Sequence, residues 1–366
     1  MFVLIVGNNP DARTELETAI ADFGLDWQIA LANNDTEAME LAAQRTIDVA
    51  VVDLLAPGVD GPTLLAAIRQ RYPEVVRLLV IEDSQQDAAL RVLESAHRFL
   101  NKPLRADELI EAVESVGELR EILDSPQLKA LIGAIGELPP APSLYLKLTK
   151  ALSDPNAKAN AAATLVAQDP VMASKVLRLC NSAFFSGGRT VADIRTAVVR
   201  LGQENLRRLV LASEVFSGSQ ADNGIDREAM QLRALRASQL AGRLLGGSSA
   251  ELAATAALLS DVGMLLPGVS IPRPGEPATY DMPHYAEAGA YLLGLWGLPM
   301  PIVEAVASHH QPGKSRSRGF WVGGAVHVAR ALVSGDDIDE HYLESVGLLD
   351  RLPAWRKMAA DMSTDT

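Results

Sequence analysis

The sequence predicts a multidomain protein: an N-terminal α/β domain with a (βα)5 doubly wound parallel sheet, followed by an all-α domain. Three observations lead to this fold class. The chain of 366 residues is longer than one hydrophobic core usually organises, so two domains are expected. In residues 1–123, short apolar runs alternate with segments of helical spacing, which is typical of a parallel sheet with helical connections. Beyond residue 143, almost no segment alternates with period two, and apolar residues recur at helical spacing instead.

The first domain is predicted element by element from this alternation. Strands are expected at 2–6, 27–30, 49–54, 77–81 and near residue 99, and helices at 11–23, from residue 35, 62–71, 87–94 and 106–123. The run Val49–Leu54 is apolar apart from Asp53, as expected for a parallel strand that is covered on both faces. Open sheets of this kind place their chemistry at the carboxyl ends of the strands, which is where Asp53 and Lys102 stand.

Two segments at these strand ends carry a family resemblance. The segments DLLAPGVDG (residues 53–61) and FLNKP (residues 99–103) resemble the receiver domain of bacterial response regulators. The resemblance implies that Asp53 stands at the phosphoacceptor position, that Lys102 stands at the position of the lysine that contacts the phosphoryl group, and that Phe99 is the switch aromatic.

The same pocket departs from the receiver pattern in its metal ligands. The two acidic residues that hold Mg²⁺ in receivers align with Gly7 and Asn8, or with Asn8 and Asn9, so neither alignment supplies a carboxylate. Asp83 stands where a threonine or serine would bond the phosphoryl oxygen. We therefore predict a degenerate pocket without Mg²⁺ and with an Asp53–Lys102 ion pair. A conventional response regulator phosphorylated on Asp53 remains the alternative.

The connection between the domains is predicted to span residues 124–142. The apolar stripe of the 106–123 helix continues beyond the length that a receiver needs, and Ser125-Pro126 then interrupts it before a further short helix. Such a stripe suits a lever between the domains or a homodimer through the 106–123 helix, and local packing of the stripe is the alternative.

The helical domain begins with an ordered set of helix boundary signals. Asp169-Pro170 predicts a helix start, because aspartate caps free N–H groups and proline suits the first turn. Asn181-Ser182 is expected to end that helix, and Gly202 to stand just after the end of the next one. Further helices are predicted at the ranges 204–216, 226–245, 250–259, 286–295, 300–309 and 320–333.

This ordered set, with the segment LPPAP (residues 138–142) before it, resembles the HDOD domain, a catalytically degenerate relative of the HD phosphohydrolases. The predicted HDOD domain spans residues 143–355, with a tail at 356–366. The resemblance implies that Asp169, Pro170, Asn181, Ser182 and Gly202 are architectural rather than catalytic.

The metal ligands of HD enzymes are only partly retained. Ser260 stands at the histidine of the HD pair, and Arg233 aligns with a lone histidine ligand. Four candidate ligands remain and resemble the HD-GYP branch; this possible vestigial metal site comprises Asp261, His284, His309 and His310. With two ligands lost, we expect no bound metal and no hydrolysis. A metal-dependent HD-type phosphodiesterase acting on a nucleotide or cyclic dinucleotide is the alternative.

The composition limits the remaining function classes. A formal net charge of −13 disfavours direct binding of nucleic acid, because the chain repels phosphate backbones. A single cysteine, Cys180, fits a reducing compartment, and no apolar run is long enough to span a bilayer. The sequence therefore predicts a cytoplasmic bacterial signal-transduction regulator without cofactors. It would act by protein–protein interaction with signalling proteins, with the degenerate receiver controlling the HDOD output domain.

Overall fold

The protein forms two compact units, the first built mainly from residues 1–137 and the second from most of residues 138–366. The structure, a computed structural model, describes residues 1–7, 17–54, 56–82, 95–135, 159–181, 190–202, 206, 225–271, 282–317 and 319–364. The predicted helix at 87–94, most of the predicted helix at 204–216 and the LPPAP segment lie outside these residues. Among the described residues, no helix combines the length and the apolar character that a bilayer span requires.

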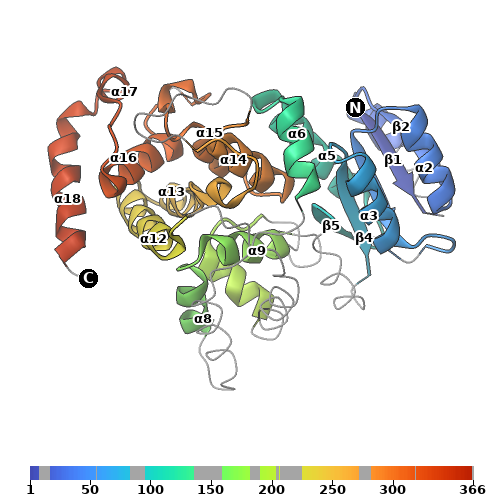
Figure 1. The fold of residues 1–366 in the computed structure, drawn as a ribbon, viewed down its shortest axis with the longest axis horizontal. Coiled ribbons are helices and arrows are strands. Elements are labelled where there is room, and N and C mark those ends of the chain that lie inside the picture. Colours follow the sequence, from blue (N-terminus) through green and yellow to red (C-terminus); the bar gives the residue numbers. More distant parts are fainter. Residues whose placement is uncertain are drawn as a thin grey trace. The chain divides into compact units, whose positions relative to one another are not determined.

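The first unit is a five-stranded parallel sheet, which confirms the predicted α/β class (Figure 1). Its strands are β1 (Phe2–Val6), β2 (Gln28–Ala32), β3 (Val49–Asp53), β4 (Val76–Ile81) and β5 (Arg98–Asn101), in the spatial order β2-β1-β3-β4-β5. The central strands are apolar because both of their faces are covered, and every residue of β4 is buried. The order of the strands reverses between β1 and β3. Open sheets carry their sites at such a point, beyond the carboxyl ends of the strands, and this is where β3 ends.

Helices α2 (Asp35–Gln44), α3 (Gly61–Arg71) and α5 (Ala106–Ile122) connect or follow these strands. Local chemistry starts α3: the Asp60 side chain accepts a hydrogen bond from the Thr63 N–H, and a proline occupies the first turn. The apolar side chains of α5 that suggested a dimer seam, among them Val113, Val116 and Leu119, are buried in the structure. Their burial supports the alternative that the stripe packs locally.

Helix α6 (Pro126–Ala134) lies in the predicted 124–142 connection and belongs to the first unit. Arg77, a fully buried cation on β4, donates from Nη2 to the Gly133 carbonyl at 2.8 Å. Gly133 also approaches the chain at Pro73 so closely that an added Cβ would lie 1.4 Å from the Pro73 carbonyl oxygen. Only glycine allows this approach, and α6 is thereby fixed to the sheet unit.

The second unit is helical, as predicted. It contains α8 (Ala159–Val166), α9 (Pro170–Cys180), α12 (Arg227–Leu244), α13 (Ser248–Leu259), α14 (Tyr285–Leu295), α15 (Met300–Ser308), α16 (Val322–Ser334), α17 (Glu340–Ser345) and α18 (Leu352–Thr364). Short 3-10 turns stand at η2 (Val262–Leu265), η3 (Pro312–Lys314) and η4 (Leu349–Arg351). Helix α18 contains most of the segment 356–366, which was expected to be a tail without a helix.

The boundary signals around α9 act as the sequence predicted. The buried Asp169 carboxylate accepts hydrogen bonds from the N–H groups of Val171 and Met172, at 2.8 and 3.1 Å, and Pro170 is the first residue of the helix. Asn181 follows the last residue of α9, while Ser182 lies outside the described residues. Gly202 has a φ of 75°, the left-handed conformation expected just after a helix end.

Candidate functional site

The pocket at the carboxyl edge of the sheet contains the predicted ion pair. Lys102 Nζ lies 2.8 Å from Asp53 Oδ1 and 3.6 Å from Glu82 Oε1. Asp53 is the last residue of β3, and Lys102 directly follows β5, so the parallel sheet brings the two together. Phe99 is 2% exposed and belongs to the core of this unit. The predicted pocket residues Asn8, Asn9 and Asp83 lie outside the described residues.

A second cluster of polar side chains is buried among the helices of the second unit. Asp261 stands just after α13, Tyr285 begins α14, His309 and His310 follow α15, and Arg330 lies on α16. Asp261 is 3% exposed and Arg330 8%, so both charges are enclosed by protein. The chain therefore places a carboxylate, a guanidinium, a phenol and imidazoles in one interior space.

The close approach of two elements fixes the geometry of this cluster. Gly263, in the turn η2 that follows Asp261, packs against the start of α14, and an added Cβ would lie 1.9 Å from the Tyr285 carbonyl oxygen. Any larger residue would push α14 away from η2. Gly263 therefore keeps Asp261 and Tyr285 within reach of each other.

Arg330 is the centre of the hydrogen-bond network. Its Nε donates to Asp261 Oδ1 at 2.8 Å, its Nη2 to the Tyr285 hydroxyl at 3.0 Å, and its Nη1 to Asp336 Oδ2 at 2.5 Å. Burial alone would lower the pKa of Arg330, but the carboxylate of Asp261 raises it above its ordinary value. The guanidinium is thus a permanent cation, held by the acceptors around it.

The histidines complete the network as neutral rings. His310 Nε2 lies 2.6 Å from the Tyr285 hydroxyl, and His309 Nε2 lies 3.2 Å from it. Burial lowers the pKa of His310 to about 4, with a further contribution from Arg330. Burial, reinforced by His310 and Arg330, holds the pKa of His309 well below its ordinary value. Protonating either ring would add a positive charge beside Arg330.

The remaining polar groups at this site have partners of their own. His309 Nδ1 lies 2.7 Å from the Val306 carbonyl and donates to it, since a carbonyl oxygen only accepts. The Ser260 hydroxyl donates to the Ala257 carbonyl at 3.0 Å. His284 stacks on Tyr285, with ring centroids 4.8 Å apart, and its Nδ1 accepts the Ala286 N–H at 3.2 Å.

These residues do not fit a divalent metal ion. The Asp261 oxygen that faces the cluster already accepts from Arg330, and a guanidinium repels a second cation in the same space. The four predicted vestigial ligands do come together: the rings of His284 and His309 both contact His310. The Tyr285 hydroxyl and Arg330, however, take up the contacts of Asp261. Among the described residues, no group of three or more His, Cys, Asp or Glu side chains could hold a metal ion.

Sequence reasoning missed Tyr285 and Arg330, which join the predicted residues into one network. Tyr285 directly follows His284 in the sequence, so the predicted site included its neighbour but not the tyrosine itself. Arg330 had a signal of its own, because it is a cation on a helix whose residues from Gly324 to Ala331 are otherwise uncharged and buried. A buried cation requires an anionic partner, and Asp261 was the candidate within the retained motif.

Comparisons with known proteins define the class of this chain. A family model for the response regulator receiver domain matches residues 3–114, and one for the HDOD domain matches residues 138–273. The chain therefore joins a receiver domain to an HDOD domain.

Individual relatives share parts of the chain. The DNA-binding transcriptional regulator NtrC of Escherichia coli K12 is 34% identical over 114 residues, which are 31% of this chain and 24% of NtrC. This chain thus spans about a quarter of that relative's length. An uncharacterized protein of Treponema pallidum is 28% identical over 199 residues, which are 48% of this chain and 38% of that protein.

Two solved structures resemble parts of the chain. The MmoQ response regulator from Methylococcus capsulatus is 21% identical with a TM-score of 0.48, and the match covers 60% of this chain and 98% of that one. The receiver domain of an HD domain-containing protein from Pseudomonas fluorescens is 28% identical with a TM-score of 0.28, and the match covers 33% of this chain and 88% of that one.

Proposed function

We propose that the protein is a non-catalytic regulator in the bacterial cytoplasm, in which a degenerate receiver controls an HDOD domain that binds other signalling proteins. The observation that carries this proposal is the buried ion pair between Arg330 and Asp261. An HD-type hydrolase needs a divalent ion to activate water and to stabilise charge on the phosphoryl group. Here Asp261, the aspartate that this chain retains from the HD pair, is already paired with Arg330.

The protonation states of the cluster point the same way. A metal site requires free electron pairs on neutral imidazoles together with unpaired carboxylates. The His310 ring is neutral at pH 7, but its Nε2 already shares a hydrogen bond of 2.6 Å with the Tyr285 hydroxyl. We therefore propose that the cluster serves the packing of α13–α16 and holds neither a metal nor a nucleotide.

The ion pairs in the receiver pocket favour a receiver whose conformation does not depend on phosphorylation. Lys102 bridges Asp53 and Glu82, so both carboxylates at this edge face an internal cation. We propose that this arrangement holds the receiver in one conformation and that the receiver controls access of partner proteins to the HDOD domain.

Hydrolysis is tested directly with the full-length chain. The protein is incubated with Mn²⁺, Fe²⁺ or Mg²⁺ and with cyclic dinucleotides and nucleoside phosphates, and products are separated by chromatography beside an active HD-type hydrolase. We expect no product above the protein-free blank. Turnover that is lost in Asp261→Asn would overturn the non-catalytic proposal.

Partner binding is tested by affinity capture from a bacterial lysate with crosslinking. Lys102→Ala breaks the receiver ion pair, and we expect it to change the set or the amount of captured proteins. Arg105→Ala is the matched control, because Arg105 forms an exposed pair with Asp107 on the same domain. Identical capture by all three proteins would contradict control by the receiver.

A further inference from the structure

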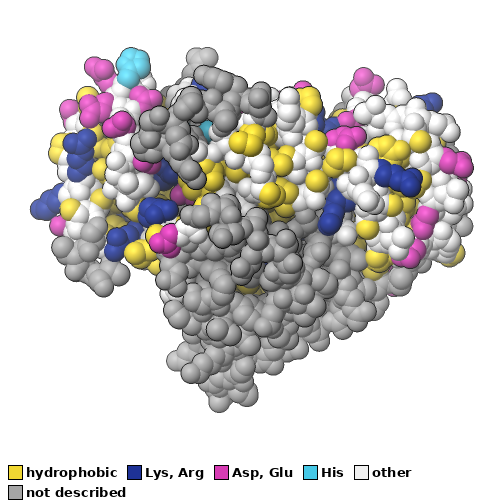
Figure 2. Space-filling model, in the orientation of Figure 1, with side chains coloured by type: hydrophobic (Ala, Val, Ile, Leu, Met, Phe, Trp, Pro, Cys, Tyr) yellow, Lys and Arg dark blue, Asp and Glu magenta, His cyan; other side chains and the backbone are white. Residues whose placement is uncertain are grey.

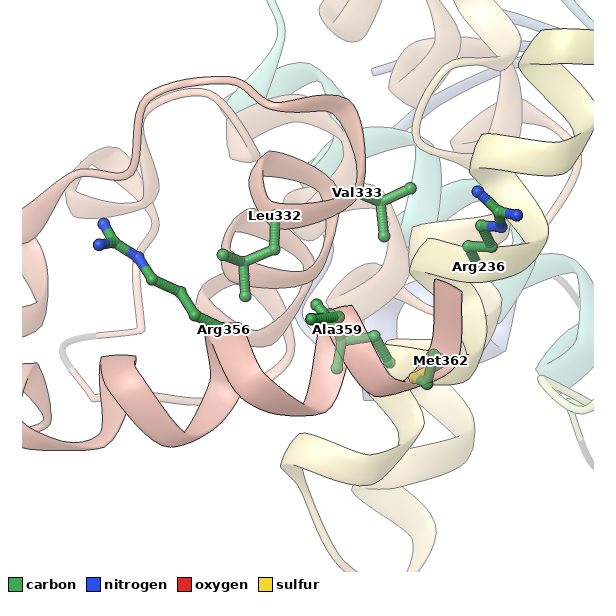
Figure 3. Close-up of a pocket in the computed structure, with 8 residues that line it drawn as sticks. Arg236, Leu332, Val333, Arg356, Ala359 and Met362 are labelled. Carbon is green, nitrogen blue, oxygen red and sulfur yellow. The ribbon is translucent and has the colours of Figure 1, made fainter. Parts of the chain in front are cut away.

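A cavity of about 310 Å³ lies in the second unit, between α12, α16 and α18 (Figure 3). Leu240 of α12 forms part of its wall, and Leu332 and Val333 of α16 face Ala359 and Met362 of α18. This volume is at the lower end of the range for small-molecule sites, roughly 300–1,000 Å³. It is separate from the Arg330 cluster.

Among the described residues, the charged side chains that line this cavity are Arg236 of α12 and Arg356 of α18, and the other lining side chains of this set are apolar. In Figure 3 the two arginines stand at opposite ends of the row of apolar side chains. On the surface, Lys and Arg side chains gather over α18 and the neighbouring part of α12 (Figure 2). The cavity therefore combines apolar walls with positive charge.

Arg236 indicates where an anion would bind. Its side chain belongs to the lining of the cavity, while its Nε is enclosed by protein atoms and has no hydrogen-bond acceptor among the described residues, so an anion would meet the terminal Nη groups. A guanidinium binds an anionic oxygen more strongly than a neutral acceptor. Arg356 forms an ion pair with Glu340 at 3.6 Å, and both side chains are about 60% exposed, so this pair holds Arg356 weakly.

We infer that this cavity binds a single-chain anionic amphiphile: a medium-chain carboxylate or alkyl phosphate. Its head lies against Arg236, and its aliphatic chain lies between the apolar side chains of α16 and α18. The described lining residues offer apolar surface and two guanidinium groups, so the recognition is for charge at one end and for apolar surface along the body. Because α16 also carries Arg330, the ligand would pack on the helix that organises the interior of the HDOD unit.

Isothermal titration of the full-length protein with sodium decanoate, kept below its micelle concentration, tests this site. We expect saturable binding of one decanoate per chain. Decanol has the same chain without the charge, and decyltrimethylammonium has the opposite charge; we expect both to bind at least about tenfold more weakly, the loss of one charge-assisted contact. Decyl phosphate in a parallel titration distinguishes the two head groups.

Two variants locate the binding. Arg236→Gln should weaken decanoate binding by about tenfold or more, while Arg243→Gln, two turns further along α12 and outside the lining, should leave it unchanged. Ala359→Phe fills the space opposite Leu332 and Val333 and should abolish binding while circular dichroism remains that of the wild type. No saturable binding up to roughly 1 mM would overturn the inference, as would equal affinity for decanol or full binding by Ala359→Phe.

Discussion

Replacing Arg330 with methionine keeps most of the side-chain length and removes the buried charge. Asp261 would then remain 3% exposed, with the Tyr285 hydroxyl at 3.4 Å as its nearest remaining side-chain donor in the cluster. Removing one partner of a buried ion pair costs about 3–5 kcal/mol, because the other charge stays buried without compensation. The lost contact with Asp336 adds less than about 1 kcal/mol, since that carboxylate is 49% exposed.

We therefore expect Arg330→Met to lower the free energy of unfolding of the second unit by about 4 kcal/mol at pH 7. Urea unfolding followed by tryptophan fluorescence measures this loss, because Trp321 and Trp355 both lie in this unit. Arg351→Met, at an exposed arginine of η4, is the matched control and should change stability by no more than about 0.5 kcal/mol.

A double-mutant cycle identifies the partner of Arg330. In the Asp261→Asn background the uncompensated carboxylate is absent, so Arg330→Met should cost at least about 1–2 kcal/mol less than in the wild type. A loss below about 1 kcal/mol for the single variant would refute the reasoning, as would strict additivity of the two substitutions, because either result would mean that the pair does not stabilise the fold.

Three further predictions follow from other contacts. Acetyl phosphate with Mg²⁺ should leave the intact mass of the protein unchanged, since positions 7–9 supply no carboxylate to hold the Mg²⁺ beside Asp53; a gain of one phosphoryl group that Asp53→Asn abolishes would contradict this. Gly263→Ala should destabilise the second unit by about 1–3 kcal/mol in urea, because its Cβ meets the backbone of α14, whereas Gly246→Ala, with open space around it, should not. The pKa of His310, about 4 in the folded protein and 6.5 ordinarily, means that the unfolded chain binds more protons between these values. Stability should therefore fall as the pH drops from about 6.5 towards about 4, and the decrease in Tm should be smaller in His310→Gln than in a variant of the exposed His341.

The sequence predicted the features that depend on local patterns. Apolar runs placed all five strands, and the order of the receiver-like sheet brought Asp53 to Lys102. The Asp169 cap and the left-handed Gly202 followed from the residue types at helix boundaries. Each of these features is determined by residues close in sequence or by a well-defined topology, so short-range reasoning was sufficient.

The interior of the second unit could not be predicted in the same way. Aligning ligand positions revealed which metal-binding residues were missing, but it could not reveal which side chain fills the vacated space. That side chain, Arg330, lies 69 residues after Asp261 and reaches it only because α13 and α16 pack together. His284 illustrates the converse: it was predicted as a ligand, but it stacks on Tyr285 and its ring accepts a hydrogen bond from the Ala286 N–H.

A guanidinium and a divalent ion make different demands on the same residues. A metal ion accepts electron pairs from ligands arranged around it, whereas a guanidinium donates its N–H groups to acceptors, which Asp261, Tyr285 and Asp336 supply here. The imidazoles need not bind the cation at all, but they must be neutral, which their lowered pKa values ensure. The adjacent histidines therefore retain a packing role beside Arg330. A metal ion would also couple stability to its concentration, while the single positive charge of an arginine is part of the chain itself. The stability of this interior therefore does not depend on the divalent ions that surround the protein.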